Sequence, residues 1–248
     1  MSGFLSPPLV LTSEAEHARL EETMAYAYTH GIIMGTKGAA TGASSSSSVV
    51  VQHAPFALYP FEYPRPAFAL AVSLSRRFNR LMQAICRDPA WIQGVLRETV
   101  RADPFTARLL DLMNLVEHER SSPTSACFQH VSLGILRSDY MLHSRPGDPR
   151  NLLQVEINTI ASSFGCISSR VVDMAKTVEG GDVYAPQDVP DNGAVEGLAR
   201  GIASAQAEWV RQLGGDGTVA GSGPVVLMVV QPGETNFCDQ RLLHFALR

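Results

Sequence analysis

Apolar side chains recur at helical spacing in several stretches of the chain. The first stretch begins with Ser13-Glu14-Ala15-Glu16, which reads as a capping box and precedes an apolar stripe of Leu20, Met24 and Ala27. We therefore predict a helix that begins after Ser13 and ends near Gly31. The same spacing predicts three further helices, whose apolar stripes are Ala71, Leu74, Phe78, Leu81, Met82 and Ile85; Leu109, Met113 and Val116; and Leu198, Ile202, Ala205 and Trp209. We expect the first two of these stripes to be core positions.

Strand patterns fill the middle of the sequence. The pattern turns to strand from Cys127 to Leu142, a turn follows at Arg145-Pro146-Gly147-Asp148-Pro149, and Leu152 starts the next strand. From Gln154 to Asn158 polar and apolar residues alternate, which is typical of a half-buried strand with Val155 and Ile157 in the core. We predict a long antiparallel hairpin.

The polar face of this hairpin suggests chemistry. Side chains two apart in a strand share a face, so Gln154, Glu156 and Asn158 are expected together. A carboxylate beside an amide oxygen suits Mg²⁺, which one or two protein oxygens usually hold together with substrate phosphates. The alternative is an ordinary solvated sheet face. The opposite arm carries Arg137, for which an ion pair with Asp139 or Glu156 is the simplest interpretation.

The C-terminal part has a different pattern. The run from Val225 to Val230 is continuously apolar, as in a strand buried on both faces of a parallel sheet. Ligands of such sheets bind beyond the carboxyl ends of the strands, which is where Glu234, Asn236 and Gln240 follow. The alternative is a polar loop that caps the helix expected from Asp239.

Composition narrows the class of protein. The chain has 248 residues, 45% of them hydrophobic and 18% charged, which allows a sizeable core. A net charge of −4 argues against general binding to nucleic acid or to a membrane surface, and no apolar run is long enough to span a bilayer. Four scattered cysteines without a Cys-x-x-Cys pair are typical of reduced thiols, and with no secretory signal at Met1–Val10 we expect a cytoplasmic protein.

Several short motifs carry a family resemblance. In their order and spacing they resemble eukaryotic-type glutathione synthetase, an ATP-grasp ligase, over about residues 12–241. The resemblance implies an α+β fold of the ATP-grasp type, with a helical N-terminal part, an antiparallel sheet and the truncated start of a parallel α/β substrate-binding subdomain. The motifs are Ala54-Pro55-Phe56, Asp103-Pro104-Phe105-Thr106-Ala107-Arg108-Leu109, Leu136-Arg137-Ser138-Asp139-Tyr140-Met141, Glu156-Ile157-Asn158-Thr159-Ile160, Gly197-Leu198-Ala199-Arg200-Gly201-Ile202-Ala203 and Asn236-Phe237-Cys238-Asp239-Gln240-Arg241.

The resemblance also implies a reaction and its residues. ATP phosphorylates γ-glutamylcysteine, and the amine of glycine attacks the acyl phosphate. By the same resemblance Glu156 and Asn158 hold Mg²⁺, Glu156 contributes to the ATP site, and the protein is a homodimer. The implied contacts to γ-glutamylcysteine are Arg137, Ile160, Ala161, Ser162, Ser163, Glu234, Thr235, Asn236 and Gln240. Two positions depart from the family pattern: Ala161 stands where serine is common, and Cys166 replaces a glycine.

The resemblance covers only the first half of the family's length, because its glycine-rich lid, ATP-binding lysines and glycine-binding arginine lie beyond the position of Arg248. We therefore expect residues 1–213 to form the N-terminal part of the ligase domain, with a flexible loop at 37–49. A linker at 214–224 and the truncated start of the substrate-binding subdomain at 225–248 would follow. On this interpretation the chain is a fragment or splice product that is inactive alone, and the alternative function is a non-catalytic binding or dimerising subunit. The acceptor, glycine or β-alanine, stays open.

Overall fold

The computed structural model describes residues 13–36, 50–120, 131–143, 151–178, 184–212 and 225–248. These residues form two compact units. The first comprises Met1–Glu62, Ser163–Ser204 and Val225–Arg248, and the second comprises Tyr63–Ser162 and Ala205–Pro224. The loop predicted at 37–49, the turn at 145–149 and the linker at 214–224 lie outside the described residues, as does Cys127.

The first unit begins with helix α1 (Glu14–Thr29), and its capping box is confirmed. The side chain of Ser13 accepts the backbone N–H of Glu16, and the Glu16 carboxylate accepts the backbone N–H of Ser13 at 3.1 Å. The buried face differs from the predicted stripe, however. Arg19 and Thr23 are buried beside Ala27, whereas Leu20 and Met24 are only partly buried. The reason is that Arg19 satisfies its polar atoms internally, which apolar periodicity does not detect.

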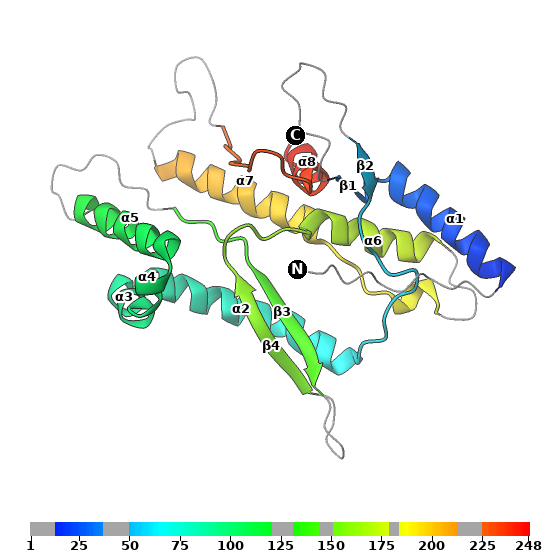
Figure 1. Cartoon of the computed structure of the whole chain (residues 1–248), viewed down its shortest axis with the longest axis horizontal. Coiled ribbons are helices and arrows are strands. Elements are labelled where there is room, and N and C mark those ends of the chain that lie inside the picture. The colour runs from blue at the N-terminus through cyan, green and yellow to red at the C-terminus, as the bar shows by residue number, and fades with distance from the viewer. Residues whose placement is uncertain (1–12, 37–49, 121–130, 144–150, 179–183, 213–224) are drawn as a thin grey trace. The chain divides into compact units, whose positions relative to one another are not determined.

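Two short strands and three helices complete this unit. Strands β1 (Ile33–Gly35) and β2 (Val51–His53) pair antiparallel, with Met34 opposite Gln52. After an irregular segment that follows β2, the unit resumes with α6 (Gly165–Thr177) and the 3₁₀ turn η1 (Pro186–Asp188). Helix α7 (Ala194–Gln212) starts in this unit, and α8 (Phe237–Ala246) ends the chain (Figure 1).

The core of the first unit forms where α1, β1, β2 and α6 meet. Its buried members are Ala27, Ile32, Ala54, Ile167, Met174 and Val178. Backbone hydrogen bonds connect these segments, since the Ile32 N–H donates to the Ala27 carbonyl and the Ala54 N–H donates to the Ile32 carbonyl. Leu242 of α8 packs against the same cluster, so the C-terminal helix belongs to this core.

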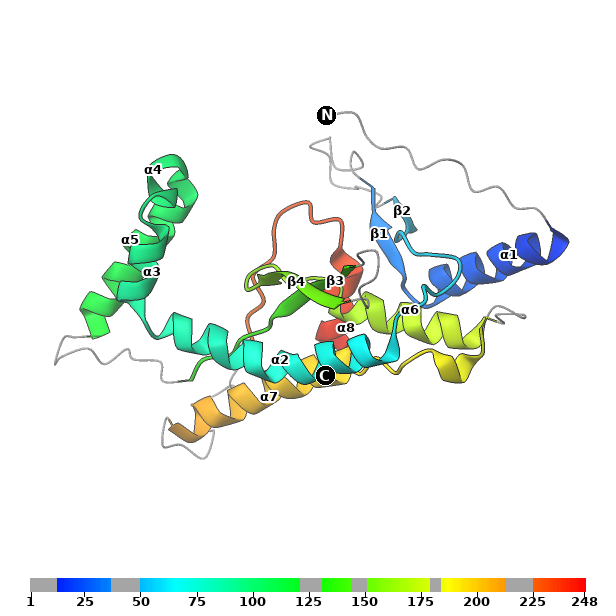
Figure 2. The same ribbon diagram turned by 90° about the horizontal axis from the view of Figure 1, so that it is seen from below.

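The second unit combines helices with the predicted hairpin. Helix α2 (Arg65–Cys86) is followed by α3 (Pro89–Leu96), α4 (Thr99–Ala102) and α5 (Pro104–Arg120), which group together beyond the C-terminal end of α2 in Figure 2. Strands β3 (Arg137–His143) and β4 (Asn151–Asn158) pair antiparallel, which confirms the hairpin. The first strand begins at Arg137, later than predicted, because residues 131–136 are irregular.

Three predictions about burial are wrong. The run Val225–Val230 forms no strand, and Val225, Leu227 and Val229 are each 85% or more exposed. Val155 is 57% exposed, because the register shifts between Asp139 and Tyr140 and leaves it without a partner in the pairing. Leu81, Leu109 and Val116 have the predicted helical spacing but are exposed, since no described element covers those faces.

None of the helices in the described part of the chain combines the length and the apolar character that crossing a membrane requires.

Candidate functional site

The hairpin brings four polar side chains onto one face. Arg137 is paired with Asn158, and Asp139 is paired with Glu156, in an uninterrupted part of the register. Residues two apart in a strand point to the same side, so all four side chains share one surface. The predicted arrangement of Arg137 across from the Glu156 and Asn158 pair is therefore confirmed. Gln154 lies beyond the register shift.

Hydrogen bonds connect these four side chains. The guanidinium of Arg137 donates from Nε to Oδ1 of Asp139 at 2.9 Å and from Nη2 to Oδ2 at 3.0 Å, which is a bidentate pair. The amide nitrogen of Asn158 donates to Oδ2 of Asp139 at 3.2 Å and to Oε1 of Glu156 at 3.1 Å. Because both carboxylates take the Nδ2 hydrogens, Oδ1 of Asn158 stays available as an acceptor for a cation.

The charges on this face influence one another. The hydrogen bond from Arg137 holds the pKa of the Asp139 carboxyl below its usual value, although partial burial opposes the effect. The same bond raises the pKa of Arg137, and the charge of Glu156 adds to that effect. The ion-pair interpretation of Arg137 is thus confirmed for Asp139. It is compatible with substrate binding, because Nη1 makes no bond to Asp139.

The segment after β4 turns sharply. The hydroxyl of Ser162 donates to the carbonyl of Asn158 at 2.9 Å, and Ala161 adopts a positive φ of 52°. Positive φ is uncommon for a residue with a Cβ, so the turn is held by its surroundings. Ile160 points into solvent, at 74% exposure. The predicted contact segment is therefore a constrained, accessible turn that leads directly from the polar face.

A buried carboxylate holds the start of α6. Phe164 has a positive φ of 68° and precedes the helix without a side-chain cap of its own. Asp239 of α8 supplies the missing acceptors: its Oδ2 accepts the N–H of Phe164 at 2.8 Å, and its Oδ1 accepts those of Cys166 and Ile167 at 2.9 Å each. A helix N-terminus favours a negative charge, so this contact complements the dipole of α6.

The second predicted contact set lies just before α8. Glu234 and Thr235 are in the loop, Asn236 is the residue before the helix, and Gln240 lies in its first turn. The Oε1 atom of Glu234 accepts the backbone N–H of Asn236 at 2.8 Å. The carbonyl of Thr235 accepts the N–H of Gly35 at 2.7 Å, which anchors the loop to β1. Glu234 thus bonds within the loop, but no described side chain caps α8, and the helix begins at Phe237 rather than at Asp239.

Asn236 carries an unsatisfied polar atom. Its side chain is 8% exposed, and its Oδ1 is buried without a hydrogen-bond partner among the described residues. Leaving a buried acceptor unpaired costs roughly 1–3 kcal/mol, so such an atom calls for an explanation.

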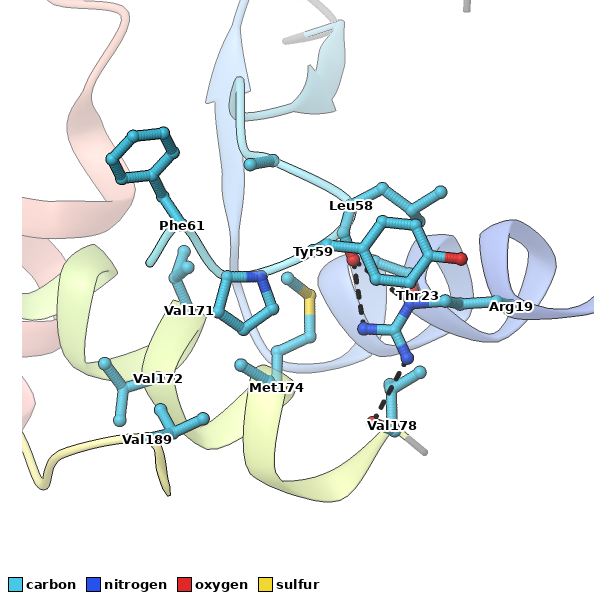
Figure 3. Close-up of a pocket in the computed structure, with 13 residues that line it drawn as sticks. Arg19, Thr23, Leu58, Tyr59, Phe61, Val171, Val172, Met174, Val178 and Val189 are labelled. Atoms are coloured by element: carbon cyan, nitrogen blue, oxygen red, sulfur yellow. Dashed lines mark hydrogen bonds between the residues drawn. The ribbon is translucent and has the colours of Figure 1, made fainter. Parts of the chain in front are cut away.

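A pocket of about 240 Å³ lies elsewhere in the first unit (Figure 3). The guanidinium of buried Arg19 forms one end, donating to the carbonyl of Leu58 at 3.0 Å and to the hydroxyl of Tyr184 at 2.8 Å, and it lies 4.6 Å from the centre of the Tyr59 ring. The other walls come from α6, including Met174, from Val178 just after that helix, and from residues 57–61 after β2. None of the predicted site residues lines this pocket.

Three residues that matter here escaped the sequence-based reasoning. Arg19 was missed because charged residues are rarely buried. For Asp239 the sequence predicts only the start of a helix, since nothing in it reveals an acceptor that reaches more than 70 positions back. For Asp139 it predicts only an ion pair, although this residue stands two positions after Arg137 and therefore on the same face.

No group of three or more His, Cys, Asp or Glu side chains in the described ranges is arranged to hold a metal ion. A magnesium site on the hairpin would therefore combine Glu156 with the amide oxygen of Asn158 and with ligands from elsewhere. This is the usual pattern for Mg²⁺, which keeps waters and substrate oxygens.

Comparison with known proteins decides the family. The model of the eukaryotic glutathione synthase ATP-binding domain matches residues 13–215. The chain belongs to the eukaryotic glutathione synthase family. The resemblance seen in the motifs is thereby confirmed, and the membership covers both the hairpin face and the turn that follows it.

Individual glutathione synthetases are also similar to this chain. The chain is 35% identical to glutathione synthetase of Xenopus laevis over 88% of its own length and 42% of the relative's. It is also 35% identical to the Homo sapiens protein over 82% of its length and 40% of the relative's. The chain thus spans less than half the length of the curated relatives it matches.

A solved structure supports the fold. The apo structure of a glutathione synthetase-like effector from Globodera pallida superposes with a TM-score of 0.67 at 17% identity, covering 94% of this chain and 46% of the effector. The chain is therefore a mixed fold of helices and small antiparallel sheets, of the kind found in a glutathione synthetase-like protein.

Proposed function

We propose that the chain serves glutathione synthesis, the ATP-dependent ligation of γ-glutamylcysteine and glycine. In this proposal the chain carries contacts to γ-glutamylcysteine and part of the Mg²⁺–ATP site. The family membership supports the reaction class, which is formation of a C–N bond at the expense of ATP. On the same basis we propose that the chain has the ATP-grasp fold with a separate substrate-binding subdomain, that it forms a homodimer and that it is cytoplasmic.

The observation that carries the dipeptide contact is the unpaired Oδ1 of Asn236. An N–H donor placed there would satisfy a buried acceptor, and the carboxylate of Glu234 next to it favours a donor with positive charge. The α-ammonium group of the γ-glutamyl residue has both properties. Thr235 and Gln240 flank this position, and Gln240 extends the set onto the first turn of α8.

The turn formed by Ile160, Ala161, Ser162 and Ser163 is the second contact in the proposal. Ser162 uses its hydroxyl to close the turn, so Ser163 and the exposed backbone are the groups left for the dipeptide. Ala161 supplies no hydroxyl, so one hydrogen bond, worth roughly 0.5–1.5 kcal/mol, is absent relative to a serine there.

On the hairpin face the residues fit Mg²⁺ and an anionic substrate. Glu156 and Oδ1 of Asn158 provide two hard oxygen atoms, and bound Mg²⁺ would neutralise the charge of ATP phosphates. Arg137 offers Nη1 to a substrate carboxylate. The transferred γ-phosphoryl group joins the dipeptide carboxylate as ADP leaves, and glycine's amine then displaces phosphate with loss of a proton.

A second function is a non-catalytic subunit that binds the dipeptide or pairs with a longer chain. One assay separates the two functions. The purified chain is supplied with ATP, Mg²⁺, γ-glutamylcysteine and glycine, and both ADP and glutathione are measured.

The ligase function is supported if ADP and glutathione form in equal amounts. This activity should be lost in Glu156→Ala and retained in Glu196→Ala, a control at an exposed residue. Absence of both products, with saturable binding of γ-glutamylcysteine, supports the binding subunit. Absence of products and of binding contradicts both functions.

A further inference from the structure

Two carboxylates lie near Arg137 on the hairpin, and its guanidinium bonds to only one of them. Asp139 and Glu156 are direct cross-strand neighbours, so the guanidinium lies near both. The influence of Glu156 on the pKa of Arg137 shows that this carboxylate is within electrostatic reach. Even so, both hydrogen bonds of the guanidinium to a carboxylate go to Asp139.

Asp139 also determines how Asn158 is oriented. The Nδ2 atom of Asn158 donates to Oδ2 of Asp139 and to Oε1 of Glu156, and both carboxylates can only accept. With its two hydrogens taken, the amide cannot turn over without placing Oδ1 against a carboxylate oxygen. This orientation leaves Oδ1 available as an acceptor.

We propose that Asp139 is a positioning residue of this site, which holds Arg137 away from Glu156 and fixes the amide of Asn158. The inference rests on the proposed function and extends it to a residue that itself touches neither dipeptide nor nucleotide. It gives the two carboxylates separate tasks: Asp139 orients the arginine, and Glu156, whose Oε1 accepts from Asn158, keeps Oε2 for a cation.

Without the charge of Asp139 the strongest remaining partner for Arg137 is Glu156. A bidentate pair with Glu156 would consume the carboxylate that the cation needs and turn Nη1 away from its position on the face. An asparagine at position 139 keeps the size and one acceptor oxygen, and it removes the charge that decides between the two carboxylates.

The test is calorimetric titration of the full chain with γ-glutamylcysteine in a double-mutant cycle. The four proteins are the wild type, Asp139→Asn, Arg137→Ala and the double variant. Asp139→Asn is expected to weaken binding by about tenfold, in the range seen when groups that orient a ligating side chain are lost. In the Arg137→Ala background the same change should have no further effect, because Asp139 acts through the arginine.

Asp173→Asn is the matched control, since Asp173 pairs with Arg170 at 3.6 Å on the surface of α6. Its affinity for the dipeptide should equal that of the wild type. Circular dichroism melts of all five proteins identify any that fail to fold, and the cycle is evaluated below their transitions. A purely structural Asp139 would lower the melting temperature and leave the affinity of the folded chain unchanged.

The outcomes separate two failures. If the wild type binds the dipeptide and Asp139→Asn binds equally well, or if the effects of the two substitutions add, the positioning role is overturned and the proposed function stands. If the wild type itself does not bind, the proposed dipeptide site is overturned, together with the role assigned to Asp139.

Discussion

The Oδ1 atom of Asp239 lies 2.9 Å from the backbone nitrogen of Ile167, 72 positions earlier in the chain. The carboxylate thereby joins the first turn of α6 to the first turn of α8. The first follows the turn at Ile160–Ser163, and the second follows the loop with Glu234 and Asn236. Ser163 and Asn236, which both belong to the first unit, therefore lie within a few residues of this contact along the chain.

Replacing Asp239 should therefore destabilise the first unit. Asp239→Asn leaves one acceptor oxygen and points a donor at backbone N–H groups that need an acceptor. We expect a loss of about 3 kcal/mol in the free energy of unfolding, measured by urea denaturation. The control is Asp188→Asn in the exposed η1 turn, which should change stability by less than about 0.5 kcal/mol. Equal midpoints for the two variants would contradict the account of Asp239.

Cys166 should react slowly with thiol reagents. It is buried, and burial raises the pKa of its thiol to about 11, with the nearby Asp239 carboxylate adding to the effect. The thiolate is the reactive species, so at pH 8 almost none of it is present. Mass spectrometry after a timed iodoacetamide pulse should show exposed Cys86 alkylated well before Cys166. Comparable rates at the two cysteines would show that Cys166 is accessible and ionised.

Arg19 should contribute to stability through its hydrogen bonds rather than through its charge alone. A lysine cannot reach the Leu58 carbonyl and the Tyr184 hydroxyl together with the guanidinium's fixed geometry. Arg19→Lys is expected to lower the free energy of unfolding by about 2 kcal/mol in chemical denaturation. Arg76→Lys on the exposed surface of α2 provides the matched control and should be nearly neutral. A neutral Arg19→Lys would mean that the observed bonds add no stability.

The Arg137–Asp139 pair should make the second unit sensitive to acid. The pKa of Asp139 is lowered in the folded chain, so its stabilisation is fully present above the pKa of the unfolded state, roughly 4. It is lost as the pH falls through the lower folded pKa. Both side chains are partly exposed, so the effect is at most about 1 kcal/mol.

The test is urea denaturation of the wild type and of Asp139→Asn from pH 7 to pH 2.5. The two unfolding free energies should differ at neutral pH and converge below pH 4. A difference that stays constant across this range would contradict the role of the ionised carboxylate.

The sequence correctly predicts those elements that depend on residues close to one another in the chain. The Ser13 and Glu16 capping box starts α1 as predicted, and alternation around Glu156 predicted the hairpin and its polar face. Interactions between distant segments were not predictable. The bulge that exposes Val155 depends on the partner strand, and the carboxylate of Asp239 acts on residues far back in the chain.

The run Val225–Val230 is a second case in which interactions between distant segments decide the structure. Its composition is that of a buried strand, but a strand also needs neighbours to pair with, and periodicity contains no information about them. The position of Arg137 opposite Asn158 follows from the strand pairing, whereas the roles of these two residues come from the family motifs and are proposed.

The central claim, that the segments joined by Asp239 bind γ-glutamylcysteine, is tested most directly by nuclear magnetic resonance. The dipeptide is titrated into ¹⁵N-labelled chain, and the backbone amides of Ser163 and Asn236 are followed, with that of Asn114 on exposed α5 as an internal control. The account predicts that the Ser163 and Asn236 signals shift together along one saturable curve, that Asn114 stays fixed, and that Asn236→Ala abolishes the response. No saturable shift at either residue, or an undiminished shift of Ser163 in Asn236→Ala, would contradict it.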